Sequence, residues 1–260
     1  MCLVGFRWDP ASDEPLLLLA NRDESFARPT AALHVWPRDS QEYPSILAGK
    51  DLLKGGTWLG ITESGRFAAV TNVRDALARR DGRSRGELTR AFLEGTTSPR
   101  AYADDVAAHA HEIASFNLFV GDREEIFYVA DHFETGAAHG EARALQPGVH
   151  VVSNGRLGDA WPKVRRLEEL LRTAAPGTPD AVLFRAMLDR TGAPDAELPS
   201  TGVPHEIERL LAPPFIAQPD YGTRASTLVR FSRHGAHIVE RTFSPGGQEA
   251  GERVLATASD

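Results

Sequence analysis

The sequence predicts an α+β fold built mainly from antiparallel sheet. Two observations support this class. Short apolar runs occur in pairs joined by turn residues, which is typical of β-hairpins, and segments with helical spacing fall into separate blocks. The regular alternation of strand and helix that builds a parallel sheet does not occur. We therefore expect sheets and helices to form separate layers.

Three hairpins are predicted in the first half of the chain. Residues 2–8 and 16–20 are apolar runs on either side of the turn-rich residues 9–13. The other two hairpins pair residues 57–62 with 67–73 and residues 117–120 with 126–130. Because the first hairpin begins at residue 2, the start of the chain is expected to lie within a sheet.

Helices and a closing set of strands are the other predicted elements. Helices are predicted at 86–93 and 99–114, from Pro162 onward, and from an N-cap at Asp180. Strands are predicted at 227–231, 237–243 and 253–256. Residues 191–222 are rich in proline and glycine, and their apolar side chains predict a surface loop with one short helix.

Length and composition are those of an ordinary globular protein, and we expect one domain over residues 1–260. The net charge of −7 argues against nucleic acid as a partner, since phosphate binding needs an excess of Lys and Arg. The longest apolar run, residues 16–20, is too short for a transmembrane segment, and residues 1–15 lack the pattern of a signal peptide. A cytoplasmic location is therefore expected.

Cys2 is the only cysteine, so neither an internal disulfide nor a cysteine-based zinc site can form. A lone cysteine is usually a small buried apolar residue. At position 2, however, removal of Met1 would leave a thiol and a free α-amine on the same residue. The α-amine has an ordinary pKa of about 7.7–8.0, so it can take the thiol proton near neutral pH. Cys2 is thus a candidate nucleophile with its own base.

Residues 21–24 (Asn-Arg-Asp-Glu) are the next polar cluster, directly after a buried run. Arg22 near the thiol would lower the thiol pKa, and the carboxylate of Asp23 or Glu24 could hold the N-terminal amine. The alternative is a polar turn with an exposed ion pair, which would contribute little to stability.

Three later residues could complete a catalytic site. Asn72 and Asn154 are each expected to terminate an apolar strand, where a side-chain amide or a neighbouring N–H can point toward an oxyanion. Arg224 begins a strand and could supply positive charge. The alternative for each asparagine is a turn or helix cap.

Other clusters are less specific. His109 and His111 lie about 200° apart on a helix and no His-x-x-x-His occurs, so no metal site is expected. Six arginines lie between residues 74 and 90, where they form either a solvated surface or a region that steers an anionic ligand.

Seven motifs together resemble the transport-and-Golgi-organisation (NRDE) family over residues 1–243. They are Met1-Cys2, Asn-Arg-Asp-Glu at 21–24, Ala-Gly-Lys-Asp at 48–51, Gly-Gly-Thr-Trp-Leu-Gly at 55–60, Thr71-Asn72, Trp-Pro-Lys at 161–163 and Tyr-Gly-Thr-Arg at 221–224. That family is similar to N-terminal-nucleophile (Ntn) hydrolases of the bile-salt hydrolase and penicillin V acylase type. The resemblance implies a four-layer αββα sandwich with two mainly antiparallel sheets.

The resemblance also implies roles for individual residues. Cys2 matches the nucleophile, Asn72 and Asn154 match the oxyanion-hole positions, and Arg224 matches a late arginine near the thiol.

One departure concerns the early arginine and aspartate. These stand three residues apart in the related hydrolases, whereas Arg22 and Asp23 are adjacent. Whether Asp23 or Glu24 orients the Cys2 amine therefore stays open.

Two functions follow from the resemblance, and the sequence leaves both open. One is hydrolysis of a non-peptide acyl-amide C–N bond through a thioester, which needs no cofactor. The other is non-catalytic binding and trafficking of haem, acyl-lipid or acyl-coenzyme A. A haem carrier would need an axial ligand at a pocket mouth, and no Cys-x-x-Cys-His attachment site occurs, so haem would bind reversibly.

Overall fold

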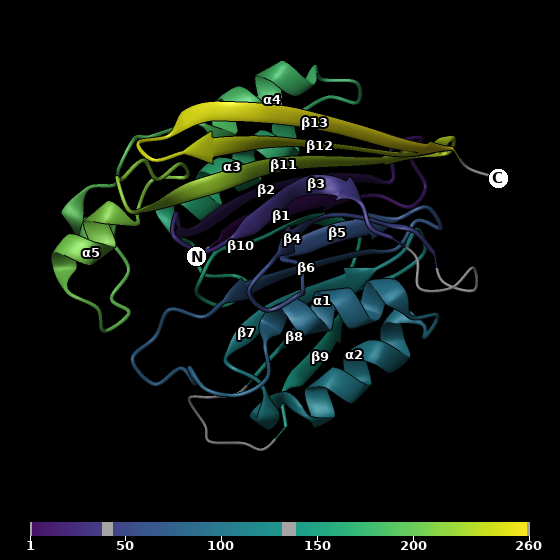
Figure 1. Cartoon of the computed structure of the whole chain (residues 1–260), viewed down its shortest axis with the longest axis horizontal. Coiled ribbons are helices and arrows are strands. Elements are labelled where there is room, and N and C mark those ends of the chain that lie inside the picture. Colours follow the sequence, from purple (N-terminus) through teal and green to yellow (C-terminus); the bar gives the residue numbers. More distant parts are fainter. Residues whose placement is uncertain (1, 38–43, 132–138, 259–260) are drawn as a thin grey trace.

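The computed structural model describes residues 2–37, 44–131 and 139–258. Two antiparallel sheets pack face to face, and helices cover the outer face of each sheet, which gives a four-layer αββα sandwich (Figure 1). This architecture confirms the α+β class and the layer order that the resemblance implies.

The first sheet has six strands in the order β10-β1-β2-β11-β12-β13. Their bounds are β1 Cys2–Trp8, β2 Leu16–Ser25, β10 Gly148–Val152, β11 Tyr221–Ser232, β12 Gly235–Ser244 and β13 Gln248–Ala258. Cys2 begins strand β1, which confirms that the start of the chain lies within a sheet, and β1 is an internal strand between β2 and β10.

The second sheet has seven strands in sequential order from β3 to β9. Their bounds are β3 Thr30–Val35, β4 Ile46–Asp51, β5 Leu59–Thr62, β6 Phe67–Asn72, β7 Phe116–Gly121, β8 Ile126–Ala130 and β9 Glu141–Ala144. The hairpins β5–β6 and β7–β8 confirm two of the predicted pairs.

Helices α1 and α2 cover the seven-stranded sheet, α3 and α4 cover the six-stranded sheet, and α5 lies at one end of the molecule (Figure 1). Their bounds are α1 Arg85–Glu94, α2 Pro99–Ala108, α3 Pro162–Thr173, α4 Asp180–Met187 and α5 His205–Leu210, with short 3₁₀ turns at Ala110–Glu112 and Asp195–Glu197. No helix within the described ranges is both long enough and apolar enough to cross a lipid bilayer.

Two helix boundaries differ from the sequence-based expectation. Helix α2 ends at Ala108, because a 3₁₀ turn replaces its expected last residues. Asp180 is the first helical residue of α4 and Pro179 is the N-cap, so the expected capping role of Asp180 is wrong. The short helix expected within residues 191–222 is confirmed as α5.

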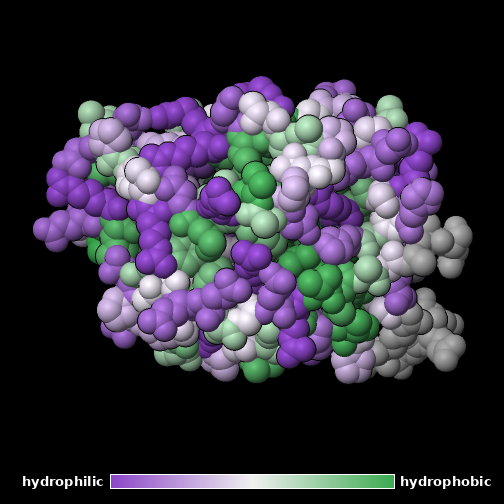
Figure 2. All heavy atoms as spheres, turned by 90° about the horizontal axis from the view of Figure 1, so that it is seen from above, coloured by the Kyte–Doolittle hydropathy of each residue, from purple (hydrophilic) through white to green (hydrophobic). Residues whose placement is uncertain are grey.

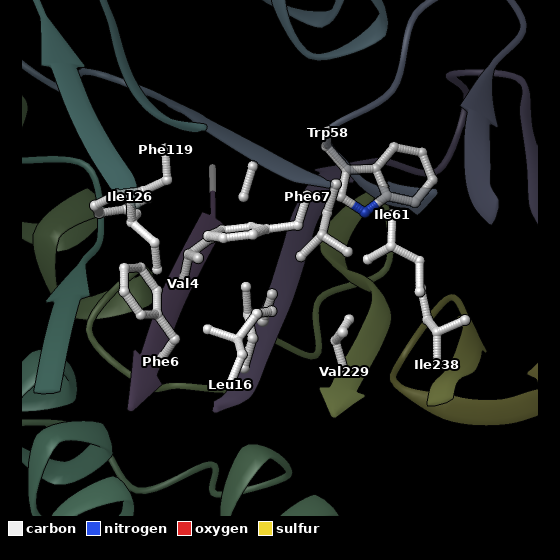
Figure 3. Close-up of a cluster of buried hydrophobic side chains, with 14 of the residues drawn as sticks. Val4, Phe6, Leu16, Trp58, Ile61, Phe67, Phe119, Ile126, Val229 and Ile238 are labelled. Atoms are coloured by element: carbon white, nitrogen blue, oxygen red, sulfur yellow. The ribbon is translucent and has the colours of Figure 1, made fainter. Parts of the chain in front are cut away.

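The main core lies between the two sheets. Val4 and Phe6 of β1 point toward Phe67 and Phe119 of the opposite sheet (Figure 3). The Phe6 ring meets those of Phe67 and Phe119 edge-on, with centroids 5.9 and 5.1 Å apart, an arrangement that aromatic pairs favour. Strand β2 is buried on both faces, which explains why residues 16–20 are apolar without alternation.

The outer surface is mixed. The face seen in Figure 2 carries hydrophobic residues in separate patches among hydrophilic ones. Scattered apolar side chains of this kind are normal on a folded protein. The polar residues that can indicate a functional site are therefore those buried inside the fold.

One of them, Glu240 of β12, carries a carboxylate in the layer between the sheets. Its Oε1 accepts a hydrogen bond from the Leu33 N–H at 2.7 Å. Burial raises the pKa of Glu240 from 4.5 to about 7, and the positive charge of Arg22 opposes the rise. Between these two values the folded state binds more protons than the unfolded state, so this carboxyl makes the fold less stable as pH rises through the interval.

Glu240→Gln keeps the hydrogen-bond acceptor and removes the ionisation. We expect the variant to gain stability relative to the wild type as pH rises from 4.5 to 7.5, by about 3 kcal/mol over the interval. Urea unfolding at four pH values would measure the difference in the free energy of unfolding. Exposed Glu249→Gln on β13 is the control and should show no such trend. A constant difference for Glu240→Gln would contradict the buried-acid assignment.

Candidate active site

Strand register brings three separate motifs together. In the β1–β2 pair Cys2 lies opposite Arg22, and in the β2–β11 pair Asp23 lies opposite Thr223. The polar run at 21–24 is therefore part of strand β2, with Asn21 to Asp23 buried. This rules out the alternative of an exposed polar turn.

The Cys2 side chain lines a cavity of about 140 Å³ at the end of the layer between the sheets. Four predicted site residues line this cavity: Cys2, Arg22, Asp23 and Asn72. The opposite sheet contributes Asn72 at the end of β6, and helix α1 contributes Arg85 at its first residue.

Cys2 is only 8% exposed. Burial raises the pKa of the Cys2 thiol, and the negative charge of Asp23 adds to the rise. The Arg22 guanidinium and a hydrogen bond from the Asp23 backbone N–H act in the opposite direction. The sequence-based expectation of a lowered thiol pKa is therefore wrong, because desolvation outweighs the nearby positive charge. Such a thiol needs a base to become nucleophilic.

Two contacts hold Arg22 beside the thiol. Its guanidinium carbon lies 4.2 Å from the centroid of the Trp58 ring, and its Nη1 donates to the Thr30 hydroxyl at 3.0 Å. Stacking on tryptophan suits the planar guanidinium and fixes its direction. Burial lowers the pKa of Arg22. Among the neighbouring charges, that of an ionised Cys2 does most to raise this pKa again.

The two acids of the motif differ in environment. Asp23 is 1% exposed, and its Oδ1 accepts a hydrogen bond from the Thr223 hydroxyl at 2.7 Å. Burial raises the pKa of Asp23, and Lys163 is the first charge that opposes the rise. Glu24 is half-buried, accepts from the Ser25 N–H at 2.9 Å and lies 3.8 Å from Arg28. Asp23 is thus the acid that lies inside the fold next to Cys2.

The two asparagines contact each other. The Nδ2 of Asn154 donates to the backbone oxygen of Asn72 at 3.0 Å and to its Oδ1 at 3.1 Å. Asn154 is fully buried two residues after β10 ends, so the expectation that it directly terminates a strand is wrong. The neighbouring Ser153 hydroxyl donates to the Cys2 carbonyl at 2.9 Å. Asn154 therefore holds Asn72, and it is Asn72 that lines the cavity.

Arg224 has a different environment from the one expected. It lies at a register shift between Thr223 and Ala225, and its Nη1 donates to the backbone oxygens of Ser25 and Arg28 at 2.8 and 3.0 Å. It is not among the residues that line the thiol cavity. A bulge redirects the side chain of the extra residue, which explains the departure.

The second arginine at the cavity is Arg85, from the basic segment 74–90. Its Nε donates to the Ser115 carbonyl at 2.8 Å. Burial lowers the pKa of Arg85, and the charge of an ionised Cys2 has the largest effect in raising it. Gly56 packs directly against Gly86, the residue after Arg85, so closely that a Cβ on Gly56 would lie 2.3 Å from the Gly86 carbonyl oxygen. This backbone contact brings the start of α1, and Arg85 with it, to the cavity. Only glycine at position 56 allows α1 to start so close to the cavity.

Lys163 is a buried residue near the site, which the sequence analysis names only within the Trp-Pro-Lys motif and gives no role. It is 2% exposed, and its Nζ donates to the Leu211 carbonyl at 3.0 Å. Burial lowers the pKa of Lys163 to about 8, and the charge of Asp23 has the largest effect in raising it. One signal was available: Lys163 lies at the i−4 position from Leu167, on the apolar stripe that faces the sheet.

A larger cavity of about 620 Å³ adjoins the thiol cavity. The two share Glu24, Asn72 and Arg85 as lining residues. The remaining wall is largely apolar and comes from α5 with its C-cap and from residues 218–221 at the start of β11: Ile207, Leu210, Leu211, Gln218, Pro219, Asp220 and Tyr221. The thiol thus lies at the polar end of a cavity that continues into an apolar one.

Comparison with solved structures supports the fold. The chain is similar to the Caenorhabditis elegans N-acylethanolamine-hydrolyzing acid amidase ortholog, with a TM-score of 0.51, 12% identity and coverage of 87% of this chain and 92% of that one. It is also similar to a mutant of the conjugated bile acid hydrolase from Clostridium perfringens, with a TM-score of 0.53, 11% identity and coverage of 99% and 92%. At these identities the likeness concerns the Ntn-hydrolase fold alone.

Comparison of sequences identifies the family. The model of the family described as Transport and Golgi organisation 2 matches residues 1–245. The Transport and Golgi organization protein 2 homolog of Bos taurus is 32% identical over 262 residues, and that of Homo sapiens is 29% identical over 257 residues, with 90% of each chain covered in both cases. This chain therefore belongs to the Transport and Golgi organisation 2 family, as the motifs indicate.

Proposed function

We propose that this protein is an N-terminal cysteine amidohydrolase that cleaves a non-peptide C–N bond in an acyl amide. The observation that carries the proposal is the position of Cys2, which opens β1 inside a cavity with Arg22, Asp23, Asn72 and Arg85. The proposal requires removal of Met1, which lies outside the described residues.

Removal of Met1 would supply the base that the buried thiol needs. The freed α-amine of Cys2 takes the thiol proton, the thiolate sulfur attacks the amide carbon, and the proton passes to the leaving amine. Water then attacks the resulting thioester and gives a proton to the α-amine. The C–S bond breaks, the proton returns to the thiolate, and the acid product leaves. Because Asp23 is buried beside Cys2 while Glu24 bonds Ser25 and faces Arg28, we assign the orienting role to Asp23.

Asn72 is the oxyanion donor in this proposal. It lines both cavities, and its Oδ1 accepts a hydrogen bond from Asn154, which orients the amide. Among the described residues, the contact of its Nδ2 is a long one, 3.4 Å to the Val73 carbonyl, so this N–H would be available to an oxyanion. Asn154, expected from the resemblance to be a second donor, would act here by holding Asn72.

The adjoining cavity supports an apolar acyl group as the other half of the substrate. Its wall includes Ile207, Leu210 and Leu211, and burial of apolar surface there would favour a hydrocarbon chain or ring system. The names of the two structural neighbours, an N-acylethanolamine-hydrolyzing acid amidase and a conjugated bile acid hydrolase, are compatible with this reaction class.

A second function, reversible binding of acyl-lipid, acyl-coenzyme A or haem, is favoured by two observations. The apolar cavity is much larger than the thiol cavity, and burial favours the protonated thiol. For haem, Tyr221 lines the apolar cavity, but its hydroxyl donates to the Asp23 carbonyl at 3.1 Å and would have to give up that bond to become a ligand.

Cys2→Ala separates the two functions. In the wild type we expect an intact mass lacking methionine and, with an activated acyl amide, a burst of about one amine per protein together with an acyl adduct on Cys2. The variant should lose burst and adduct yet still bind a fluorescent fatty-acyl probe. Intact-mass spectrometry and rapid-mixing kinetics measure these quantities. Retention of Met1 in an active preparation, or turnover by the variant, would exclude the thioester mechanism.

Asn72→Ala tests the oxyanion assignment. Loss of one donor should lower kcat on the order of 10²–10³-fold, equivalent to about 3–4 kcal/mol, with a smaller change in KM. Asn154→Ala should lower both kcat and the thermal midpoint, because a buried hydrogen-bonded amide is lost.

Asn21→Ala is the matched control, since Asn21 is also buried but donates to the Met187 and Pro214 carbonyls instead of lining the thiol cavity. It should lose stability with kcat per folded molecule retained. An equal loss of kcat in Asn21→Ala and Asn72→Ala would show that destabilisation, not a missing donor, lowers the rate.

A further inference from the structure

Asn117 is a fully buried asparagine within the apolar layer between the two sheets. It lies on β7 two residues before Phe119, which points into this layer (Figure 3), and strand residues two apart share one face of a sheet. A leucine would fill the same space without the cost of burying an amide. The position therefore indicates a need for the hydrogen bonds that the amide makes.

The Asn117 side chain joins polar side chains from three neighbouring strands. Its Nδ2 donates to the Thr71 hydroxyl at 3.0 Å and to the Gly155 carbonyl at 2.9 Å, so both amide hydrogens are used. Its Oδ1 accepts from the Tyr128 hydroxyl at 2.5 Å. Thr71 on β6 lies opposite Asn117 in the strand pairing, and Tyr128 belongs to β8. We call these three side chains, Thr71, Asn117 and Tyr128, the Asn117 network.

The Asn117 network holds residues 153–157, the segment that follows β10. This segment belongs to no helix or strand. Three of its backbone groups bond to the network: the Ser153 carbonyl at 2.7 Å, the Gly155 carbonyl at 2.9 Å and the Leu157 N–H at 3.4 Å. Side chains of the opposite sheet therefore replace the backbone pairing that would otherwise fix such a segment.

Residues 153 and 154 in turn hold two residues of the site. The Ser153 hydroxyl donates to the Cys2 carbonyl, and the Asn154 amide donates to the backbone oxygen and Oδ1 of Asn72. Asn117 is thus connected to the nucleophile and to the oxyanion donor, although it is not among the residues that line either cavity. A buried polar network whose members are all hydrogen-bonded favours one arrangement of its surroundings.

We propose that Asn117 is a positioning residue, which fixes residues 153–155 and through them the placement of Asn72 and of the Cys2 backbone at the thiol cavity. The catalytic consequence rests on the proposed hydrolase function, whereas the hydrogen-bond coupling does not. Placement matters for the rate, because a shift of about 1 Å at a catalytic group can lower turnover about 10²-fold.

The coupling can be measured without a substrate, because the chain has only four asparagines: Asn21, Asn72, Asn117 and Asn154. In protein labelled with ¹⁵N in the asparagine side chains, each gives one NH₂ signal. In Asn117→Leu we expect the Asn72 and Asn154 signals to shift and the Asn154 amide to exchange with D₂O about tenfold faster, since its segment is no longer held. The Asn21 signal should stay in place. Unchanged shifts and exchange for Asn154 would overturn the proposal.

Tyr128→Phe and Ser226→Ala form a matched pair. Asn21 is also fully buried, its Nδ2 donates to two backbone carbonyls, and its Oδ1 accepts from the Ser226 hydroxyl at 2.6 Å. Each variant therefore removes a hydroxyl donor from one buried asparagine. Tyr128→Phe should shift the signals of Asn117 and Asn154, whereas Ser226→Ala should shift the signal of Asn21 alone.

Thr71→Val and Thr71→Ser test the consequence for catalysis. Valine removes the hydroxyl that bonds Asn117 and Ser153, so kcat per folded molecule should fall about tenfold or more with little change in KM. Serine keeps the hydroxyl and should restore most of kcat. Ser226→Ala should keep the wild-type kcat per folded molecule. A lower thermal midpoint in Thr71→Val with kcat unaltered would assign the network a structural role only.

The outcomes separate the two proposals. If the wild type hydrolyses acyl amides and both Thr71→Val and Asn117→Leu keep its kcat, the positioning role is wrong and the hydrolase function stands. If the wild type shows no turnover but the Asn154 signal responds as expected, the hydrolase function fails and the coupling stands. Should Asn117→Leu not fold, the signals of Tyr128→Phe decide.

Discussion

The register between β1 and β2 is the constraint on which the site depends. Both strands are buried on both faces, and pairing Cys2 with Arg22 sends the same faces of both strands toward the opposite sheet. A slip of one residue would turn Arg22 toward α3 and Asp23 into the apolar layer. The packing of Phe6 and its neighbours sets this register. It therefore determines which side chains face the cavity at the end of the strand, as well as the fold.

Much of this arrangement can be predicted from the sequence, and the exceptions have physical reasons. Apolar runs predict the hairpin of β1 and β2 because those strands are buried. Strands β3, β4 and β9 are not predicted. β3 and β9 are edge strands with mostly exposed or half-buried side chains and no clear alternation. The apolar run of β4 is only three residues long before Gly49, too short to indicate a strand.

The residues of the site can also be predicted from the sequence in part. Motif resemblance leads to Cys2, Arg22, Asp23 and Asn72, which do line one cavity. The position of Arg224 depends on a bulge, which no local pattern indicates. Lys163 is hidden because a lysine in the first turn of a helix is read as a solvated charge, and only tertiary packing reveals its burial.

The internal position of β1 has a consequence for handling the protein. Cys2 faces a cavity of about 140 Å³ with partner strands on both sides of β1, so residues fused ahead of it would have to leave through this confined space. An affinity tag at that end would crowd the thiol and mask its amine. The opposite terminus follows β13 at the edge of its sheet, and a tag attached there would be far less intrusive.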